Sequence, residues 1–195
     1  MPSLILASQS PRRKELLEQA GYTFTTKKSE ASEHVSDEST PAEAVEELAA
    51  RKAEASHNID ETAVIIGADT VVAIKNDILE KPSDTEEARA MLKRLSGATH
   101  SVYTGVAVKS ENDIEIFHVK TDVTFYKLED GMLEAYLSTD EPYDKAGAYG
   151  IQGKGRLFVR RIEGDYFNVV GLPIARLARE LSILGIYPSF SRNVQ

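Results

Sequence analysis

Residues 8–13, Ser-Gln-Ser-Pro-Arg-Arg, have the clearest potential for chemistry in the chain. The hydroxyls of Ser8 and Ser10 and the guanidinium groups of Arg12 and Arg13 gather where an apolar strand leads into a helix. The unpaired N–H groups and the dipole of a helix N-terminus favour anions, and arginine pairs its donors with phosphate oxygens. Two cations in a first helical turn are unfavourable unless an anion binds there. The segment predicts a phosphate site, and a capped helix with two solvated arginines is the alternative.

Asp69 is a candidate metal ligand or general base. It belongs to Gly-Ala-Asp-Thr, residues 67–70, at the end of the apolar run that begins at Ala63 and is typical of a strand buried on both faces. We expect Asp69 at the end of this strand, where α/β folds usually place their active sites. A carboxylate there can bind Mg²⁺ through oxygen or orient water. A carboxylate that only caps a turn is the alternative.

Charged side chains elsewhere are candidate partners of this site. Glu30 or Glu33, in the acidic loop over 29–40, would add a second carboxylate to a metal site. Lys52, in a predicted helix, and Lys81 would bind phosphate as point charges. Ordinary surface side chains are the alternative in each case.

The segment 141–153 combines glycines with polar side chains. Glycine permits close backbone approach or a positive φ, while Asp144, Lys145 and Gln152 supply polar groups. The segment lacks the Gly-x-Gly-x-x-Gly spacing of a dinucleotide-binding loop. A ligand-binding loop and a tight connection stapled by the Asp-Lys pair both remain open.

Composition limits the class of protein. The 195 residues carry a net charge of −8 and no cysteine, which argues against a nucleic-acid polymer as partner and excludes disulfides and zinc-thiolate sites. No apolar run approaches the roughly 20 residues of a membrane span, and the N-terminus lacks the features of a secretory signal. We therefore expect a cytoplasmic protein with no membrane partner. The histidines show no metal-ligand spacing, and neither a Walker A loop nor a Gly-x-Ser-x-Gly elbow is present.

The elements that must position these residues alternate between strands and helices, as in an α/β protein. The length and the lack of a clear linker predict one domain over 1–195, which could be two closely packed lobes. Strands are predicted over 4–7, 22–26, 63–68 with 71–74, 99–109, 114–126 and both arms of a hairpin over 156–170. Helices are predicted over 11–20, 41–57, 83–95 with a capping box at 83–86, 129–138 and 172–184.

Five segments of the sequence, in their order, resemble the Maf family of nucleotide pyrophosphatases. They are residues 8–13, 67–70, 80–82, 96–97 with His100, and 144–153. The resemblance implies a mixed, strongly twisted sheet flanked by helices, with a deep cleft, similar to the inosine triphosphatase family. It also implies water attack at the α-phosphorus of a nucleoside triphosphate, release of pyrophosphate, and a homodimer.

The resemblance further assigns roles to single residues. Asp69 matches the catalytic acid, and Asp69 with Glu33 would hold a divalent cation, Mg²⁺ or Mn²⁺. The side chains that would bind phosphate are Ser8, Ser10, Arg13, Lys52 and Lys81. The positions that match base choice in the branch preferring dTTP and UTP are Arg12, Thr70 and Gln152. Cations and a metal suit this chemistry, because in-line displacement on a triphosphate needs dense positive charge.

The choice of base follows from the resemblance. The Gln152 amide offers a donor and an acceptor, which suits uracil or thymine, but an amide that flips would also suit cytosine. A pyrophosphatase for purine or methylated guanine nucleotides is one alternative. A protein that binds a nucleotide and restrains septum formation is another. Whether the target is an ordinary or a modified pyrimidine nucleotide is open.

Overall fold

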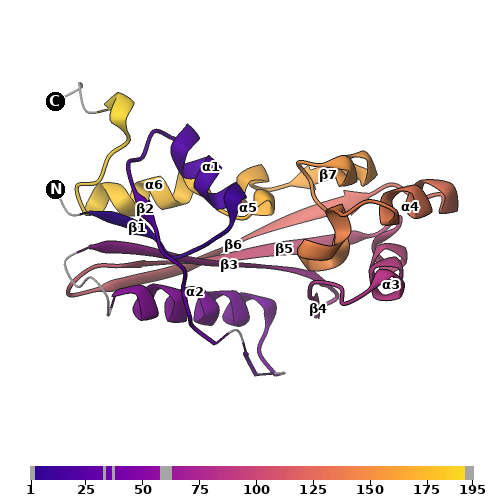
Figure 1. Ribbon diagram of the computed structural model, residues 1–195, viewed down its shortest axis with the longest axis horizontal. Helices are drawn as coiled ribbons and strands as arrows, with labels where there is room; N and C mark the ends of the chain where they lie inside the picture. Colours follow the sequence, from indigo (N-terminus) through magenta and orange to yellow (C-terminus); the bar gives the residue numbers. More distant parts are fainter. Residues whose placement is uncertain (1–2, 33, 37, 58–62, 192–195) are drawn as a thin grey trace.

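The computed structural model describes residues 3–32, 34–36, 38–57 and 63–191. Within them the sheet has seven strands, in the order β2-β1-β3-β5-β6-β7, and β4 also pairs with β3 (Figure 1). β1 runs parallel to β2 and β3, whereas all other pairs are antiparallel. The sheet is therefore mixed and twisted, as predicted. The strands are β1 (Leu4–Leu6), β2 (Thr25–Thr26), β3 (Val64–Ile74), β4 (Asp77–Leu79), β5 (Thr99–Lys109), β6 (Ile114–Phe125) and β7 (Val159–Glu163).

Helices cover both faces of the sheet. Figure 1 shows α2 along one face, α1, α5 and α6 on the other, and α3 and α4 at the far end. None of the helices in the described ranges is long and apolar enough to cross a membrane. The α-helices are α1 (Pro11–Gln19), α2 (Pro41–His57), α3 (Thr85–Leu95), α4 (Asp130–Leu137), α5 (Tyr166–Val170) and α6 (Ile174–Ile183). The 3₁₀ turns are η1 (Glu141–Asp144), η2 (Ala146–Ala148), η3 (Lys154–Phe158) and η4 (Ser189–Ser191).

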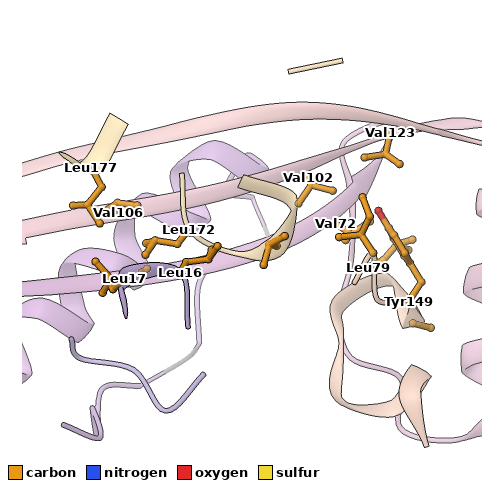
Figure 2. Packing of buried hydrophobic residues seen from close by; sticks show 14 of the residues in the cluster. Leu16, Leu17, Val72, Leu79, Val102, Val106, Val123, Tyr149, Leu172 and Leu177 are labelled. Atoms are coloured by element: carbon orange, nitrogen blue, oxygen red, sulfur yellow. The ribbon is translucent and has the colours of Figure 1, made fainter. Parts of the chain in front are cut away.

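The two faces of the sheet carry cores of different size. The larger core fills the face under α1 and α6 and continues to α3 and α4. Figure 2 shows Leu16, Leu17, Val106, Leu172 and Leu177 packed at one end of it, and Val72, Val102, Val123 and Tyr149 further along the strands. The smaller core lies against α2 and contains mostly alanines. Small side chains let α2 pack close to the strands, and the predicted apolar stripe of this helix is buried as expected: Val45, Leu48, Ala49 and Ala53.

Two glycines set how closely α2 lies on the sheet. A Cβ on Gly67 of β3 would stand 2.1 Å from the carbonyl oxygen of Ala49, and one on Gly105 of β5 would stand 2.2 Å from that of Val45. Real Cβ atoms never approach oxygen so closely, so any side chain here would push the helix away. The two glycines thus allow α2 to lie close to both β3 and β5.

β3 has one edge that is only partly paired with other strands. Its other edge pairs with β5 from Ile65 to Ala73. On the partly paired edge, β1 pairs with 64–66 and β4 with 72–74. In the described part of the chain no strand pairs with 67–71 on that edge. The last bond from the β1 side joins the Ala7 N–H to the Ile66 carbonyl at 2.8 Å, after which the chain turns into α1.

This open edge corrects the predicted position of Asp69. The strand does not end there, because the pairing with β5 continues through Asp69 to Ala73, and β3 ends at Ile74. What ends is the parallel neighbour, β1. Asp69 therefore lies inside β3 but beyond the carboxyl end of β1. α/β folds usually place active sites at the carboxyl ends of strands, and here that end belongs to β1, the parallel neighbour of the strand that bears Asp69.

Most other predicted elements are present. β5, β6, α2, α4 and α6 lie within two residues of their predicted ends, and Lys75 and Asn76 form the β3–β4 turn with φ of 52° and 68°. The predicted strand over 22–26 is reduced to the two residues of β2. The cap of α3 is one residue later than predicted, since Asp84 accepts from the Glu87 N–H.

The hairpin predicted over 156–170 is wrong in its second arm. Residues 159–163 form β7 against β6, but Tyr166–Val170 form α5. Asp165 caps this helix by accepting from the Phe167 N–H. Asn168 is fully buried, and its amide donates to the Val102 carbonyl and to Thr121, contacts that alternation along a sequence does not reveal.

Candidate active site

Arg13 occupies the open edge of β3. Its Nη1 donates to the Ala68 carbonyl at 3.0 Å and to Ser8 Oγ at 3.2 Å. Its Nη2 donates to Thr70 Oγ1 at 2.9 Å, and its Nε donates to the Gly171 carbonyl at 2.8 Å. One guanidinium group thus ties α1, β3 and the end of α5 together and satisfies a backbone carbonyl that no strand pairs with. We call Arg13, its partners Ser8 and Thr70, and the carbonyls of Ala68 and Gly171 the Arg13 cluster.

A directed chain of hydroxyl groups continues from this cluster. Thr70 Oγ1 lies 3.0 Å from Oγ1 of Thr104, which stands opposite Thr70 on β5. Thr104 in turn donates to the Asn168 carbonyl at 2.9 Å. A carbonyl can only accept, so the Thr104 proton points to it and Thr104 must accept from Thr70. The Thr70 proton is therefore committed to Thr104, while its oxygen accepts from Arg13. Thr70 holds the Arg13 cluster in place with its hydroxyl.

Asp69 points to the opposite face of β3 from Thr70. Side chains alternate along a strand, and Ile65 and Gly67, which precede Asp69 on its face, lie against α2. Asp69 Oδ1 accepts from Lys52 Nζ of α2 at 2.7 Å, with side-chain exposures of 17% and 12%. The close approach of α2 at Gly67 is what brings this pair together.

Ser8 and Ser10 shape the entrance to α1. Ser10 is the N-cap, as predicted, and its side chain accepts from the Arg13 N–H at 3.5 Å. Ser8 Oγ accepts from the Ser10 N–H at 3.2 Å as well as from the Arg13 side chain. These contacts orient both hydroxyls at a helix N-terminus, which favours anions.

One cavity of about 550 Å³ joins these groups. Nine of the ten site residues predicted from sequence line it: Ser8, Ser10, Arg12, Arg13, Lys52, Asp69, Thr70, Lys81 and Gln152. The tenth, Glu33, lies outside the described residues, so its predicted metal role stays a prediction. The described lining carries six basic side chains and two acidic ones in a protein of net charge −8. Such a local excess of positive charge attracts anionic ligands.

The side of the cavity that carries Gln152 is built around the carboxylate of Glu141. Its Oε2 accepts from the Lys154 N–H at 2.7 Å, and its Oε1 accepts from the Gly155 N–H at 3.0 Å and from the Tyr136 hydroxyl at 3.2 Å. The Tyr136 oxygen accepts in turn from the Gly150 N–H at 3.2 Å. We call Glu141, Tyr136 and the backbone of Gly150, Lys154 and Gly155 the Glu141 cluster.

An ion pair connects the two sides at the surface. Arg12 Nη1 lies 3.6 Å from Asp144 Oδ2, and the Lys145 ammonium donates to the same carboxylate and, at 2.9 Å, to the Glu141 carbonyl. Lys145 and Arg12 hold the pKa of Asp144 below its ordinary value, although partial burial acts to raise it. The Asp144–Lys145 pair therefore holds its turn together, as in the tight connection predicted as one alternative for this segment. Both residues also line the cavity.

His100 is a structural residue of the core. It is 2% exposed, and its Nε2 lies 2.8 Å from the Tyr149 hydroxyl. Burial lowers the pKa of His100 to about 4, against a smaller opposing effect of Asp122, so the imidazole is neutral at physiological pH. The contact joins β5 to the Gly-rich segment behind the cavity.

The residues present fit a hard divalent cation that is shared with a phosphate. Among the described residues no group of three or more His, Asp or Glu side chains gathers to hold a metal without help. Mg²⁺ in phosphate-transfer sites is usually held by one or two carboxylates together with substrate oxygens. Asp69, an oxygen donor on the wall of a cationic cavity, meets that requirement.

Sequence reasoning singled out the segment 141–153 but gave Glu141 itself no role, and it did not find Tyr136, Thr104 or Gly171 as parts of the site. The sequence does mark two of these positions: Glu141 begins a glycine-rich segment, and Gly171 is itself a glycine between two predicted elements. Gly171 has a φ of 126°, and a Cβ there would meet both Arg13 and Thr70 at 3.7 Å. Thr104 gave no signal, because its role depends on its register against Thr70.

The fold and the site define a mixed α/β protein with a cationic cavity at an open strand edge. The chain belongs to the Maf family, since the family model described as Maf-like protein matches residues 3–184. A protein of Bacillus pumilus named dTTP/UTP pyrophosphatase is 53% identical over 188 residues, which cover 96% of this chain and all of that protein. Proteins of the same name from Bacillus cytotoxicus and Bacillus cereus are 52% and 50% identical, over 93% and 95% of this chain and 95% and 92% of their own lengths.

Proposed function

We propose that this protein hydrolyses dTTP and UTP, and modified pyrimidine nucleotides of similar shape, to the monophosphate and pyrophosphate. The observation that carries the proposal is the cavity in which nine predicted site residues meet around the Lys52–Asp69 pair. Membership of the Maf family and the name shared by relatives of 50–53% identity support the same reaction.

Asp69 acts in this proposal as the group that orients the attacking water and accepts its proton. Lys52 donates to Oδ1 at 2.7 Å and so fixes the direction of the carboxylate. A general base needs that fixed geometry before its basicity matters, because proton transfer requires hydrogen-bond contact with the water. Attack at the α-phosphorus would place the pyrophosphate towards the basic side chains.

The basic side chains balance the charge of the triphosphate. Arg12, Lys52 and Lys81 line the cavity and are proposed to face the phosphates, together with Ser8 and Ser10 at the start of α1. Arg13 contributes its charge and holds the edge of β3 in place through the hydrogen bonds of the Arg13 cluster. A Mg²⁺ or Mn²⁺ ion, held by Asp69 and Glu33, would supply further positive charge to the phosphate oxygens.

Gln152, Arg12 and Thr70 are proposed to set base choice. The Gln152 amide can donate to and accept from the edge of uracil or thymine. Thr70 acts indirectly, since its proton is directed to Thr104 and its oxygen receives Arg13. We also propose that the protein is cytoplasmic, since a chain without cysteine is compatible with a reducing compartment. The Maf resemblance supports a homodimer, which light scattering tests.

The test is incubation with a panel of nucleoside triphosphates and Mg²⁺ or Mn²⁺, followed by separation of the products. We expect pyrophosphate and the monophosphate from dTTP and UTP, and far less from purine nucleotides. Preference for purine or methylated guanine nucleotides would refute the base assignment. Binding without turnover of any nucleotide would refute the enzymatic proposal and favour a purely nucleotide-binding protein.

A further inference from the structure

The backbone from Gly150 to Gly155 closes around a side chain of the protein itself. The N–H groups of Lys154 and Gly155 donate directly to the Glu141 carboxylate, and the Gly150 N–H reaches it through the Tyr136 hydroxyl. Gln152 lies between these anchors in the chain. The backbone that carries Gln152 into the cavity lining is therefore tied at both sides to one carboxylate.

The same carboxylate explains two glycines of this segment, Gly150 and Gly153. A Cβ on Gly153 would stand 2.3 Å from the carboxylate atoms of Glu141. A Cβ on Gly150 would meet Glu141 Oε1 at 3.0 Å and the Lys145 side chain at 2.8 Å. The close approach that these two glycines permit is thus to Glu141, and a side chain in their place would displace either the carboxylate or the turn that bears Gln152.

The Glu141 carboxylate is suited to this task because it remains charged. Burial acts to raise its pKa, but the N–H groups of Gly155 and Lys154, the Tyr136 hydroxyl and Lys145 together hold it below the ordinary value. Burial raises the pKa of Tyr136, so its hydroxyl keeps its proton and donates. Hydrogen bonds to a charged acceptor are stronger than those between neutral groups.

We propose that Glu141 is a positioning residue that sets base selectivity by holding Gln152 in place, an inference that rests on the proposed role of Gln152 in base choice. Glu141 acts through the loop and does not contact the phosphates. Its loss should weaken the contribution of the base to binding and leave the contribution of the phosphates unchanged.

Binding measurements separate these contributions without relying on turnover. The probes are a UTP analogue with an α,β-methylene bridge, the corresponding ATP analogue, and inorganic tripolyphosphate, each titrated calorimetrically. For Glu141→Gln, where an amide group replaces an oxygen that faces N–H donors, we expect the Kd of the UTP analogue to rise about tenfold. The preference for UTP over ATP should shrink by a similar factor, while the Kd of tripolyphosphate stays within about twofold.

Two further variants guard this test against misfolding. Glu134→Gln is the matched control, since Glu134 also carries a lowered pKa but receives its hydrogen bonds from Arg89 at the surface, away from the cavity. Its affinities should equal those of the unchanged protein. Tyr136→Phe removes the hydroxyl that links Glu141 to the Gly150 N–H but leaves the carboxylate in place. It should raise the Kd of the UTP analogue, as Glu141→Gln does, but by a smaller factor. Thermal melts verify that each variant is folded.

A double-mutant cycle decides whether Glu141 acts through Gln152. If it does, Glu141→Gln should add less than twofold to the loss caused by Gln152→Ala, because residues that act as one unit are not additive. Additive losses, an equal loss for tripolyphosphate, or unchanged Kd values in a folded Glu141→Gln variant would each overturn the inference. A protein that gives the expected cycle without nucleotide turnover would support this inference while refuting the proposed function.

Discussion

Each side of the cavity uses a charged side chain to hydrogen-bond backbone groups, and the two side chains carry opposite charges. The Arg13 cluster surrounds a cation with carbonyl and hydroxyl oxygens. The Glu141 cluster surrounds an anion with N–H groups and a hydroxyl. In each, one charged side chain ties together backbone that regular secondary structure leaves unpaired.

The clusters differ in the framework behind them. The Arg13 cluster is built on β3, whose far edge is paired with β5 over nine residues, and on the first turn of α1. The Glu141 cluster joins α4 to short 3₁₀ turns, η1 and η3, with no strand between them. The Arg13 cluster should therefore tolerate little change, whereas the Glu141 cluster, which depends on a single carboxylate, should be easier to alter.

The largest effect is expected at Asp69, which lies on β3 next to the Arg13 cluster but faces α2. Asp69→Asn keeps the shape of the side chain but removes the charge that Lys52 orients. Turnover of dTTP should fall by at least about 100-fold, the usual contribution of a general base. Steady-state kinetics measure the loss, and calorimetry with the methylene analogue should still detect nucleotide binding. Unchanged turnover would remove Asp69 from its proposed role.

Two neighbouring arginines provide the next comparison. Arg13→Gln should lower the free energy of unfolding by about 3 kcal/mol, because the Ala68 and Gly171 carbonyls lose a charged donor. Arg12→Gln should lower it by no more than about 1 kcal/mol, because Arg12 holds only a partly exposed ion pair at 3.6 Å. Urea unfolding measures both. Equal losses would mean that Arg13 does not brace the edge of β3.

Low pH should lower the stability of the fold through His100, which packs behind the Gly-rich segment. Its pKa is about 4 in the folded protein and 6.5 ordinarily, so the unfolded chain binds more protons between these values. Stability from neutral His100 is present above pH 6.5 and is lost as pH falls towards 4, by about 2 kcal/mol between pH 7 and 5. Urea unfolding of the unchanged protein and of His100→Gln at both pH values isolates this contribution. The same pH dependence in both would contradict it.

The smallest effects compare two glycines near the Glu141 cluster. Gly153→Ala should destabilise the fold by about 1–2 kcal/mol, because the new Cβ overlaps a carboxylate that is held by several hydrogen bonds. Gly131→Ala should stabilise it by about 0.5–1 kcal/mol, since Gly131 lies in α4 with open space around its Cα. Thermal melts give both signs. A neutral Gly153→Ala would show that the Glu141 side chain moves freely.

Much of the framework could be predicted from sequence because it depends on local patterns. Alternating apolar residues give β5 and β6, and caps and glycine stops give α1 and α6. Residues 8–13 form one segment and were predicted together as a phosphate site. That this segment shares a cavity with Asp69 and Lys81 rested on the Maf resemblance, since these residues lie far from it in the chain.

Strand pairing and contacts between distant residues account for what sequence could not give. Asp69 was expected at the end of the strand over 63–68, and the pairing with β5 shows that this segment and the one predicted over 71–74 form a single strand through Asp69. Glu141 was missed because its partners are the backbone N–H groups of residues 13 and 14 positions further along the chain. The second arm of the hairpin was wrong because Asp165 caps α5, and Asn168 of this helix is anchored by long-range contacts to Val102 and Thr121.

The most direct test of the central claim is turnover of dTTP and UTP in water enriched in ¹⁸O, with mass analysis of both products. Water attack at the α-phosphorus, oriented by Asp69, predicts one labelled oxygen in the monophosphate and none in the pyrophosphate. Label in the pyrophosphate, or release of single phosphates, would contradict the account.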